Sequence, residues 1–139
     1  MLPISLTAVF VGAISSFIIG FIFHGGPVLG KIWMKLANVK PTGNEKFSDM
    51  APQMIQNFLM NLLAAFCLAN IIFVSAIYHN TVGSIVGGMA VAFWVWLGFV
   101  VTSTSMEVIW MGKSRKLWLF EISASLVSFV VMGAIIAGW

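Results

Sequence analysis

Four long runs of hydrophobic residues follow one another along the chain, separated by shorter polar stretches. The runs cover about residues 3–23, 53–78, 84–109 and 117–138. An α-helix needs about 20 apolar residues to cross the hydrocarbon core of a bilayer, and each run is long enough. We therefore predict an all-α integral membrane protein, a four-helix bundle in which residues 1–139 form a single transmembrane domain.

The only long connection, residues 24–52, has a pattern of its own. Apolar residues recur in it at helical spacing: Val28, Leu29, Ile32, Trp33 and Leu36. This pattern predicts a short amphipathic helix lying in the membrane interface, with Trp33 at headgroup depth. We expect Ser48 or Asp49 to cap the second span, with Pro52 in its first turn.

Composition agrees with a membrane protein. Hydrophobic residues make up 60% of the chain and charged residues 8%, with a mean hydropathy of +1.04. Soluble domains carry about a quarter charged residues, so this chain cannot cover a surface that faces water. Its net charge of +3 is small and forms no continuous basic face, and we expect no nucleic-acid partner.

The positive charges predict the topology. Every lysine and arginine lies in one of two connections, at Lys31, Lys35, Lys40 and Lys46 or at Lys113, Arg115 and Lys116. Connections rich in lysine and arginine stay in the cytoplasm. We therefore predict a multi-pass protein of the bacterial inner (plasma) membrane, with a cytoplasmic loop at 24–52 and both termini outside.

Polar side chains within the spans gather toward the predicted cytoplasmic ends. They include Gln53, Asn57, Asn61, Thr102, Ser103, Ser105, Glu107, Glu121, Ser125 and Ser128, with His24 at the same level. Unpaired amides and carboxylates are costly in hydrocarbon, so they are expected to satisfy one another or to share water. We predict an inner-leaflet ligand pocket bordered by His24, Asn57, Asn61, Glu107 and Glu121. The alternative is that both glutamates pair at the surface with Arg115 or Lys116, while the amides bond to neighbouring helices.

Small residues predict how the helices pack. In the first span, Ala8, Gly12, Ser16 and Gly20 are each four residues apart. Gly83 and Gly87 open the third span at the same spacing, with Gly88 beside them. Small residues let helix backbones approach closely in lipid. We predict that Gly12, Ser16 and Gly20 line a contact between helices, and that Cys67 is a small core residue.

Motifs for catalysis are absent from the sequence. It has no histidine pair at metal-ligand spacing, no glycine-rich phosphate loop and no nucleophile-base pair. We expect no catalytic residue, no metal and no cofactor.

Short motifs along the chain carry a resemblance to a known family. They are Gly30-Lys31-Ile32-Trp33-Met34, Trp96-Leu97-Gly98-Phe99, Lys116-Leu117-Trp118-Leu119 and Gly133-Ala134-Ile135-Ile136. In their order and spacing the chain resembles a bacterial membrane-protein family of unknown function, domain-of-unknown-function family 1761. The resemblance implies four spans and no established activity. Phe23-His24 and Glu121 depart from the family's pattern, which often has an aromatic pair and an asparagine there.

Three functions remain open. The first is a non-enzymatic membrane module that binds a lipid, a small amphiphile or a partner protein through the polar face, as a homo-oligomer. The second is a small oligomeric transporter or proton-coupled exporter, which would need a polar route through both leaflets. The third is an enzyme acting on lipid with His24, Glu107 and Glu121 as acid-base groups, although the sequence supplies no nucleophile or metal for it.

Overall fold

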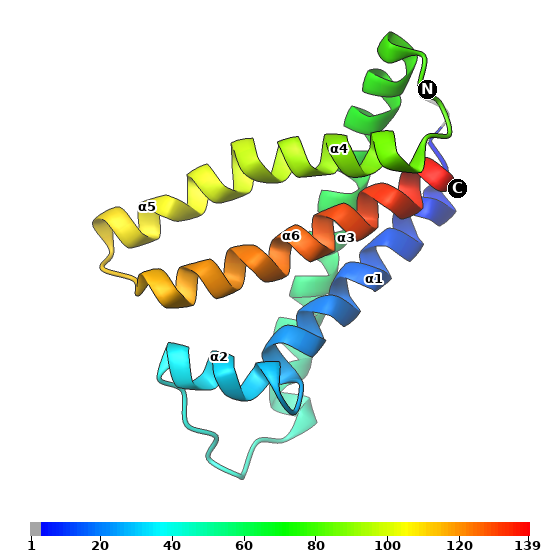
Figure 1. The fold of residues 1–139 in the computed structure, drawn as a ribbon. Helices are drawn as coiled ribbons and strands as arrows, with labels where there is room; N and C mark the ends of the chain where they lie inside the picture. The colour runs from blue at the N-terminus through cyan, green and yellow to red at the C-terminus, as the bar shows by residue number, and fades with distance from the viewer. Residues whose placement is uncertain (1–3) are drawn as a thin grey trace.

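The computed structural model describes residues 4–139, and within that range every regular element is a helix (Figure 1). The elements are α1 (Leu6–Gly25), α2 (Leu29–Ala37), α3 (Phe47–His79), α4 (Ile85–Val95), the π-helical segment η1 (Trp96–Val101), α5 (Thr102–Trp110) and α6 (Arg115–Gly138). Since α4, η1 and α5 run on without a break, four helices are long and apolar enough to cross a membrane. The predicted fold of four spans and a short helix in the first loop is confirmed, although the predicted start at residue 3 lies outside the described residues.

Helix α3 begins earlier than predicted, at Phe47 instead of residue 53. Its N-cap is Lys46, whose side chain makes no capping hydrogen bond, and Ser48 and Asp49 lie inside the helix. The predicted caps are therefore wrong. Pro52 is also inside the helix and not in its first turn, where its missing N–H deprives the carbonyl group four residues earlier of its usual donor.

The helices meet around a core of mostly small side chains. Helix α6 packs between α4 and α1, and α3 lies across them on the far side in Figure 1. The buried cluster consists of Val9, Ala13, Ala65, Leu68, Ala69, Ile72, Ala92 and Met132. Cys67 is exposed on α3, so the prediction of a core cysteine is wrong. Its neighbours Leu68 and Ala69 take the inward face of that turn instead.

The closest helix contact joins α4 to α6 through two glycines. A Cβ added to Gly88 would collide with the carbonyl oxygen of Gly133, and one added to Gly133 would lie 2.7 Å from the Cβ of Ala92. Two backbones can approach this closely only where neither carries a side chain. The small residues that open the third span therefore do form a helix contact, which Gly88 makes, whereas Gly83 and Gly87 approach no other helix.

The small residues of α1 divide into two groups. Gly12 and Ser16 are buried, and a Cβ on Gly12 would lie 3.7 Å from Met132 and Ile136 of α6. No atom lies within 4 Å of a Cβ added to Gly20. The predicted helix contact is confirmed for Gly12 and Ser16. It is wrong for Gly20, because α1 has already diverged from α3 at the level of Gly20.

The π-helical segment accounts for several polar residues of the third span. The hydroxyl groups of Thr102, Ser103 and Thr104 donate to the carbonyl oxygens of residues 98, 99 and 100, at 2.6, 2.5 and 2.7 Å. Serine and threonine hydroxyls within a helix commonly donate to the carbonyl oxygen four residues earlier. Thr102 and Ser103 thus complete the helix backbone and do not face a shared polar site.

Both described ends of the chain lie at one end of the bundle, beside the α3–α4 turn, and the other two loops lie at the opposite end (Figure 1). All seven lysines and arginines belong to the two loops at that opposite end or to the helix turns beside them. The arrangement agrees with an even number of spans. Which end faces the cytoplasm stays a prediction.

Candidate functional site

A cavity of about 490 Å³ opens between α1, α2, α3 and α6, near the basic loops. We call it the loop-end cavity. It exists because α1 and α3 separate beyond Ser16 and Asn61, where the small-residue contact of α1 ends. The wall is formed by Ser16, Phe17, Gly20, Phe21, His24, Gly25, Trp33, Met50, Met54, Asn57, Asn61, Glu121, Ala124, Ser125, Ser128 and Phe129.

Four of the five predicted site residues line this cavity. His24 comes from α1, Asn57 and Asn61 from α3, and Glu121 from α6. Glu107, on α5, is not part of the wall, since α5 packs on the outer side of α6, away from α1 and α3. Whether these residues bind a ligand stays a prediction.

The deep end of the cavity is closed by a chain of hydrogen bonds. The Ser16 hydroxyl donates to Oδ1 of Asn61 at 2.6 Å, and Nδ2 of Asn61 donates to the backbone oxygen of Asn57 at 2.9 Å and to its Oδ1 at 3.2 Å. These bonds join α1 to α3 and use both ends of the Asn61 amide. The Asn57 side chain lies nearer the mouth and is exposed.

Helix α2 brings aromatic side chains to the mouth. Gly30 allows α2 to fold back on the end of α1, because a Cβ there would lie 2.9 Å from the His24 carbonyl oxygen. The Trp33 ring then lies edge-on to the His24 ring, with centroids 5.3 Å apart. His24 Nδ1 is 2.9 Å from the Gly20 carbonyl oxygen, which can only accept, so Nδ1 carries the proton in this bond.

Trp33 is a wall residue that the sequence did not assign to the site. Its ring lines the cavity, and its expected headgroup depth stays a prediction. Its Nε1–H is buried and has no hydrogen-bond partner among residues 4–139. Because this nitrogen has almost no accessible surface, a molecule in the cavity would meet the rest of the ring and not the N–H. The sequence showed that Trp33 belongs to an amphipathic helix, but it did not show that the Trp33 ring faces a cavity.

One lysine connects the two glutamates. Lys113 Nζ lies 2.6 Å from Glu107 and also pairs with Glu121. The predicted partners, Arg115 and Lys116, are therefore wrong. Gly112 adopts a φ of +71°, and the Lys113 N–H donates to the Glu107 carbonyl oxygen at 3.1 Å, which folds Lys113 back between α5 and α6. Burial lowers the pKa of Lys113, but the hydrogen bonds and charges of Glu107 and Glu121 outweigh that effect and raise it above 10.5.

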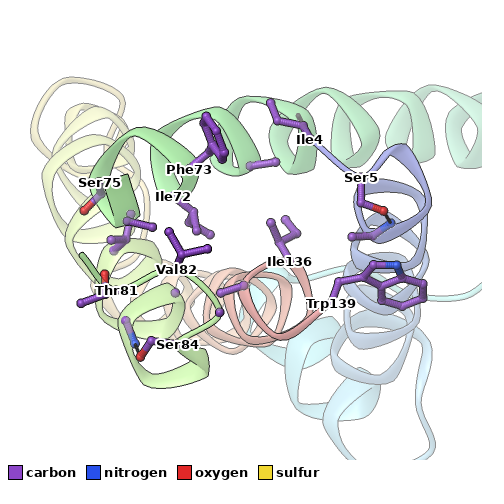
Figure 2. Close-up of a pocket in the computed structure, with 18 residues that line it drawn as sticks. Ile4, Ser5, Ile72, Phe73, Ser75, Thr81, Val82, Ser84, Ile136 and Trp139 are labelled. Atoms are coloured by element: carbon purple, nitrogen blue, oxygen red, sulfur yellow. Dashed lines mark hydrogen bonds between the residues drawn. The ribbon is translucent and has the colours of Figure 1, made fainter. Parts of the chain in front are cut away.

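A second cavity of about 300 Å³ lies at the other end of the bundle, and we call it the terminus-end cavity (Figure 2). Figure 2 shows its mainly apolar wall, to which Ile4, Ile72, Val82, Ile136 and Trp139 belong. Two of its hydroxyl groups are already used as helix caps. Ser5 Oγ accepts from the Ala8 N–H at 3.2 Å, and Ser84 Oγ accepts from the Gly87 N–H at 3.0 Å.

The two cavities differ in chemistry, and the loop-end cavity is the stronger candidate. It carries a carboxylate, an imidazole and two amides, whereas the wall of the terminus-end cavity has no ionisable side chain among the described residues. Polar groups that converge in an otherwise apolar cavity are typical of ligand sites. Within residues 4–139, no group of three or more histidine, cysteine, aspartate or glutamate side chains could hold a metal ion.

A family model described as "Protein of unknown function (DUF1761)" matches residues 7–137. The chain belongs to this family. The matched range includes every wall residue of the loop-end cavity, and it confirms the family resemblance seen in the sequence. No curated protein and no solved structure matches the chain.

Proposed function

We propose that this member of the DUF1761 family is a non-enzymatic membrane module that binds a small amphiphile or lipid in the loop-end cavity. One observation carries the proposal. His24, Asn57, Asn61 and Glu121, from three different helices, line a single cavity whose remaining wall is mainly aromatic and aliphatic, with three serines.

The mixed chemistry of the wall supports this proposal. Asn61 and Glu121 already pair with Ser16, Asn57 and Lys113, and the exposed Asn57 side chain lies nearer the mouth. The polar end of an amphiphile would meet these groups, while its apolar chain contacts Phe17, Phe21 and Phe129. The cavity volume, about 490 Å³, is in the range of known small-molecule sites, roughly 300–1,000 Å³.

Gly20 provides the test, because it lines the cavity and has free space beside it. Gly20→Trp should fill the cavity and lower the total amount of bound lipid by about tenfold, equivalent to about 1.4 kcal/mol. Protein in a non-ionic detergent would be mixed with equal amounts of phosphatidylethanolamine, phosphatidylcholine and phosphatidylglycerol, and bound lipid counted by native mass spectrometry.

Gly98→Trp is the matched control. Gly98 is exposed on a different span, and no atom lies within 4 Å of a Cβ added there. The control should retain lipid as the wild type does. Equal retention of all three phospholipids by wild type and Gly20→Trp would show that lipid binds elsewhere, and the proposed function would then fail.

We also propose that the protein lies in the bacterial plasma membrane with both termini outside. The restriction of all seven lysines and arginines to the loop end supports this orientation. It would place the loop-end cavity in the inner leaflet. Association into a homo-oligomer stays a prediction, which a mass measurement in detergent can address.

Transport is the second candidate function, and the terminus-end cavity favours it. The two cavities lie along the same helices and are separated by a buried layer that includes Ala13, Ala65, Leu68 and Met132. A transporter would have to open this layer. Flux of a bound amphiphile across proteoliposomes, blocked by Gly20→Trp, would support transport over binding alone.

A further inference from the structure

The charges around the loop-end cavity restrict what can bind there. Among residues 4–139, Glu121 and His24 are the only ionisable side chains on the wall, and no lysine or arginine belongs to it. Behind the wall, Lys113 is shared between Glu121 and Glu107. Glu121 is the carboxylate that a bound molecule meets on this wall, and a carboxylate attracts cations and repels anions, more strongly where water is excluded.

The aromatic side chains of the wall point to the same ligand charge. Phe17, Phe21, Trp33 and Phe129 all line the cavity. Aromatic faces attract ammonium groups, most strongly where water is excluded, and cages of such rings recognise choline and methylated amines. A carboxylate within an aromatic wall is therefore suited to a cationic amine.

We infer that the loop-end cavity takes an amphiphile whose polar end carries a cationic amine. Glu121 and the aromatic rings bind the amine. Ethanolamine and choline phospholipids have this chemistry, and so do free long-chain amino alcohols. The inference rests on the proposed function and adds the class of ligand to it.

The experiment compares head groups on identical acyl chains. Native mass spectrometry of the full chain in a non-ionic detergent would measure dioleoyl phosphatidylethanolamine, phosphatidylcholine and phosphatidylglycerol separately, with sphinganine as the free amino alcohol. We expect the two amine lipids to bind about tenfold more tightly than phosphatidylglycerol. Tight binding of sphinganine alone would identify a free amphiphile as the source of the same chemistry, and tight binding of the phospholipids would identify a membrane lipid.

Two glutamate variants form a matched pair. Glu121→Gln removes the charge on the wall and should abolish the preference for amine lipids while the fatty chains still bind. Glu107→Gln removes the same charge from the same cluster, but behind the wall, and should keep the preference.

Phosphatidylglycerol binding as tightly as phosphatidylethanolamine in the wild type would overturn the inference, and this comparison needs no variant to fold. Equal binding of these two lipids would not contradict the proposed function, provided that Gly20→Trp still lowers the total amount of bound lipid. A preference for amines that survives Glu121→Gln would equally overturn the assignment of Glu121. If Gly20→Trp changes nothing for any head group, the proposed function itself fails.

Discussion

Lys113 shows how a single side chain can connect two helices at the membrane surface. Its ammonium group pairs with Glu107 of α5 and Glu121 of α6, and its side chain is 22% exposed. From the sequence, Glu107 and Glu121 could equally pair with Arg115 or Lys116, which lie at a similar distance from them along the chain as Lys113 does. The positive φ of Gly112 turns the loop so that Lys113 is the residue that reaches both.

The raised pKa of Lys113 gives a pH dependence with a definite sign. Because the folded-state pKa lies above the ordinary value of 10.5, the stability that this lysine contributes is fully present below 10.5 and is lost as the pH rises through the folded-state pKa. We expect the unfolding temperature in detergent to fall over that alkaline window. Lys113→Arg should remove most of the fall, because arginine stays charged there.

Lys113→Met tests the same pairs at neutral pH. Partly exposed ion pairs contribute about 0.2–1 kcal/mol each, so we expect a small drop in unfolding temperature. If the methionine variant and the wild type show the same alkaline fall, other groups cause it and the prediction is wrong.

At the scale of elements, the α4–α6 pair depends on two glycines. Gly133→Ala would bring a Cβ to 2.7 Å from Ala92 and against the Gly88 carbonyl oxygen, so the helices would have to move apart. Overpacking of this kind costs about 1–3 kcal/mol. We expect a lower unfolding temperature, measured in one detergent at fixed protein concentration.

Gly98→Ala is the control for that substitution. Gly98 also lies in a membrane span, but a Cβ there meets no atom within 4 Å. The alanine should leave the unfolding temperature unchanged or raise it slightly, since glycine is the poorer helix former by about 1 kcal/mol. A Gly133→Ala protein as stable as Gly98→Ala would contradict the close contact between α4 and α6.

At the scale of the whole molecule, topology can be tested with one cysteine at a time. Cys67→Ala removes the natural thiol, and Asn80→Cys or Ser114→Cys then marks the α3–α4 turn or the α5–α6 loop. With both termini outside, a membrane-impermeant maleimide added to intact cells should label position 80 and not position 114. The opposite labelling would reverse the orientation and move the loop-end cavity to the outer leaflet.

The sequence by itself determined the helical spans of this protein and the placement of its charged residues along them. Hydrophobic length is a property of each segment alone, so the four spans, the interfacial pattern around Trp33 and the confinement of basic residues to two loops could be predicted. The same holds for the depth of His24, Asn57, Asn61 and Glu121. Depth follows from position along a helix, since each residue advances it by about 1.5 Å.

The tertiary structure decided which of these residues meet. Residues at one depth face each other only if the helices have the right rotation and tilt, and these depend on where backbones pack most closely. Contact at Gly88 and Gly133 and divergence of α1 from α3 near Gly20 set those angles here. In this packing Glu107 is not part of the cavity wall, and Cys67 is exposed. No local pattern contains that information, because close packing is a property of pairs of helices and not of one segment.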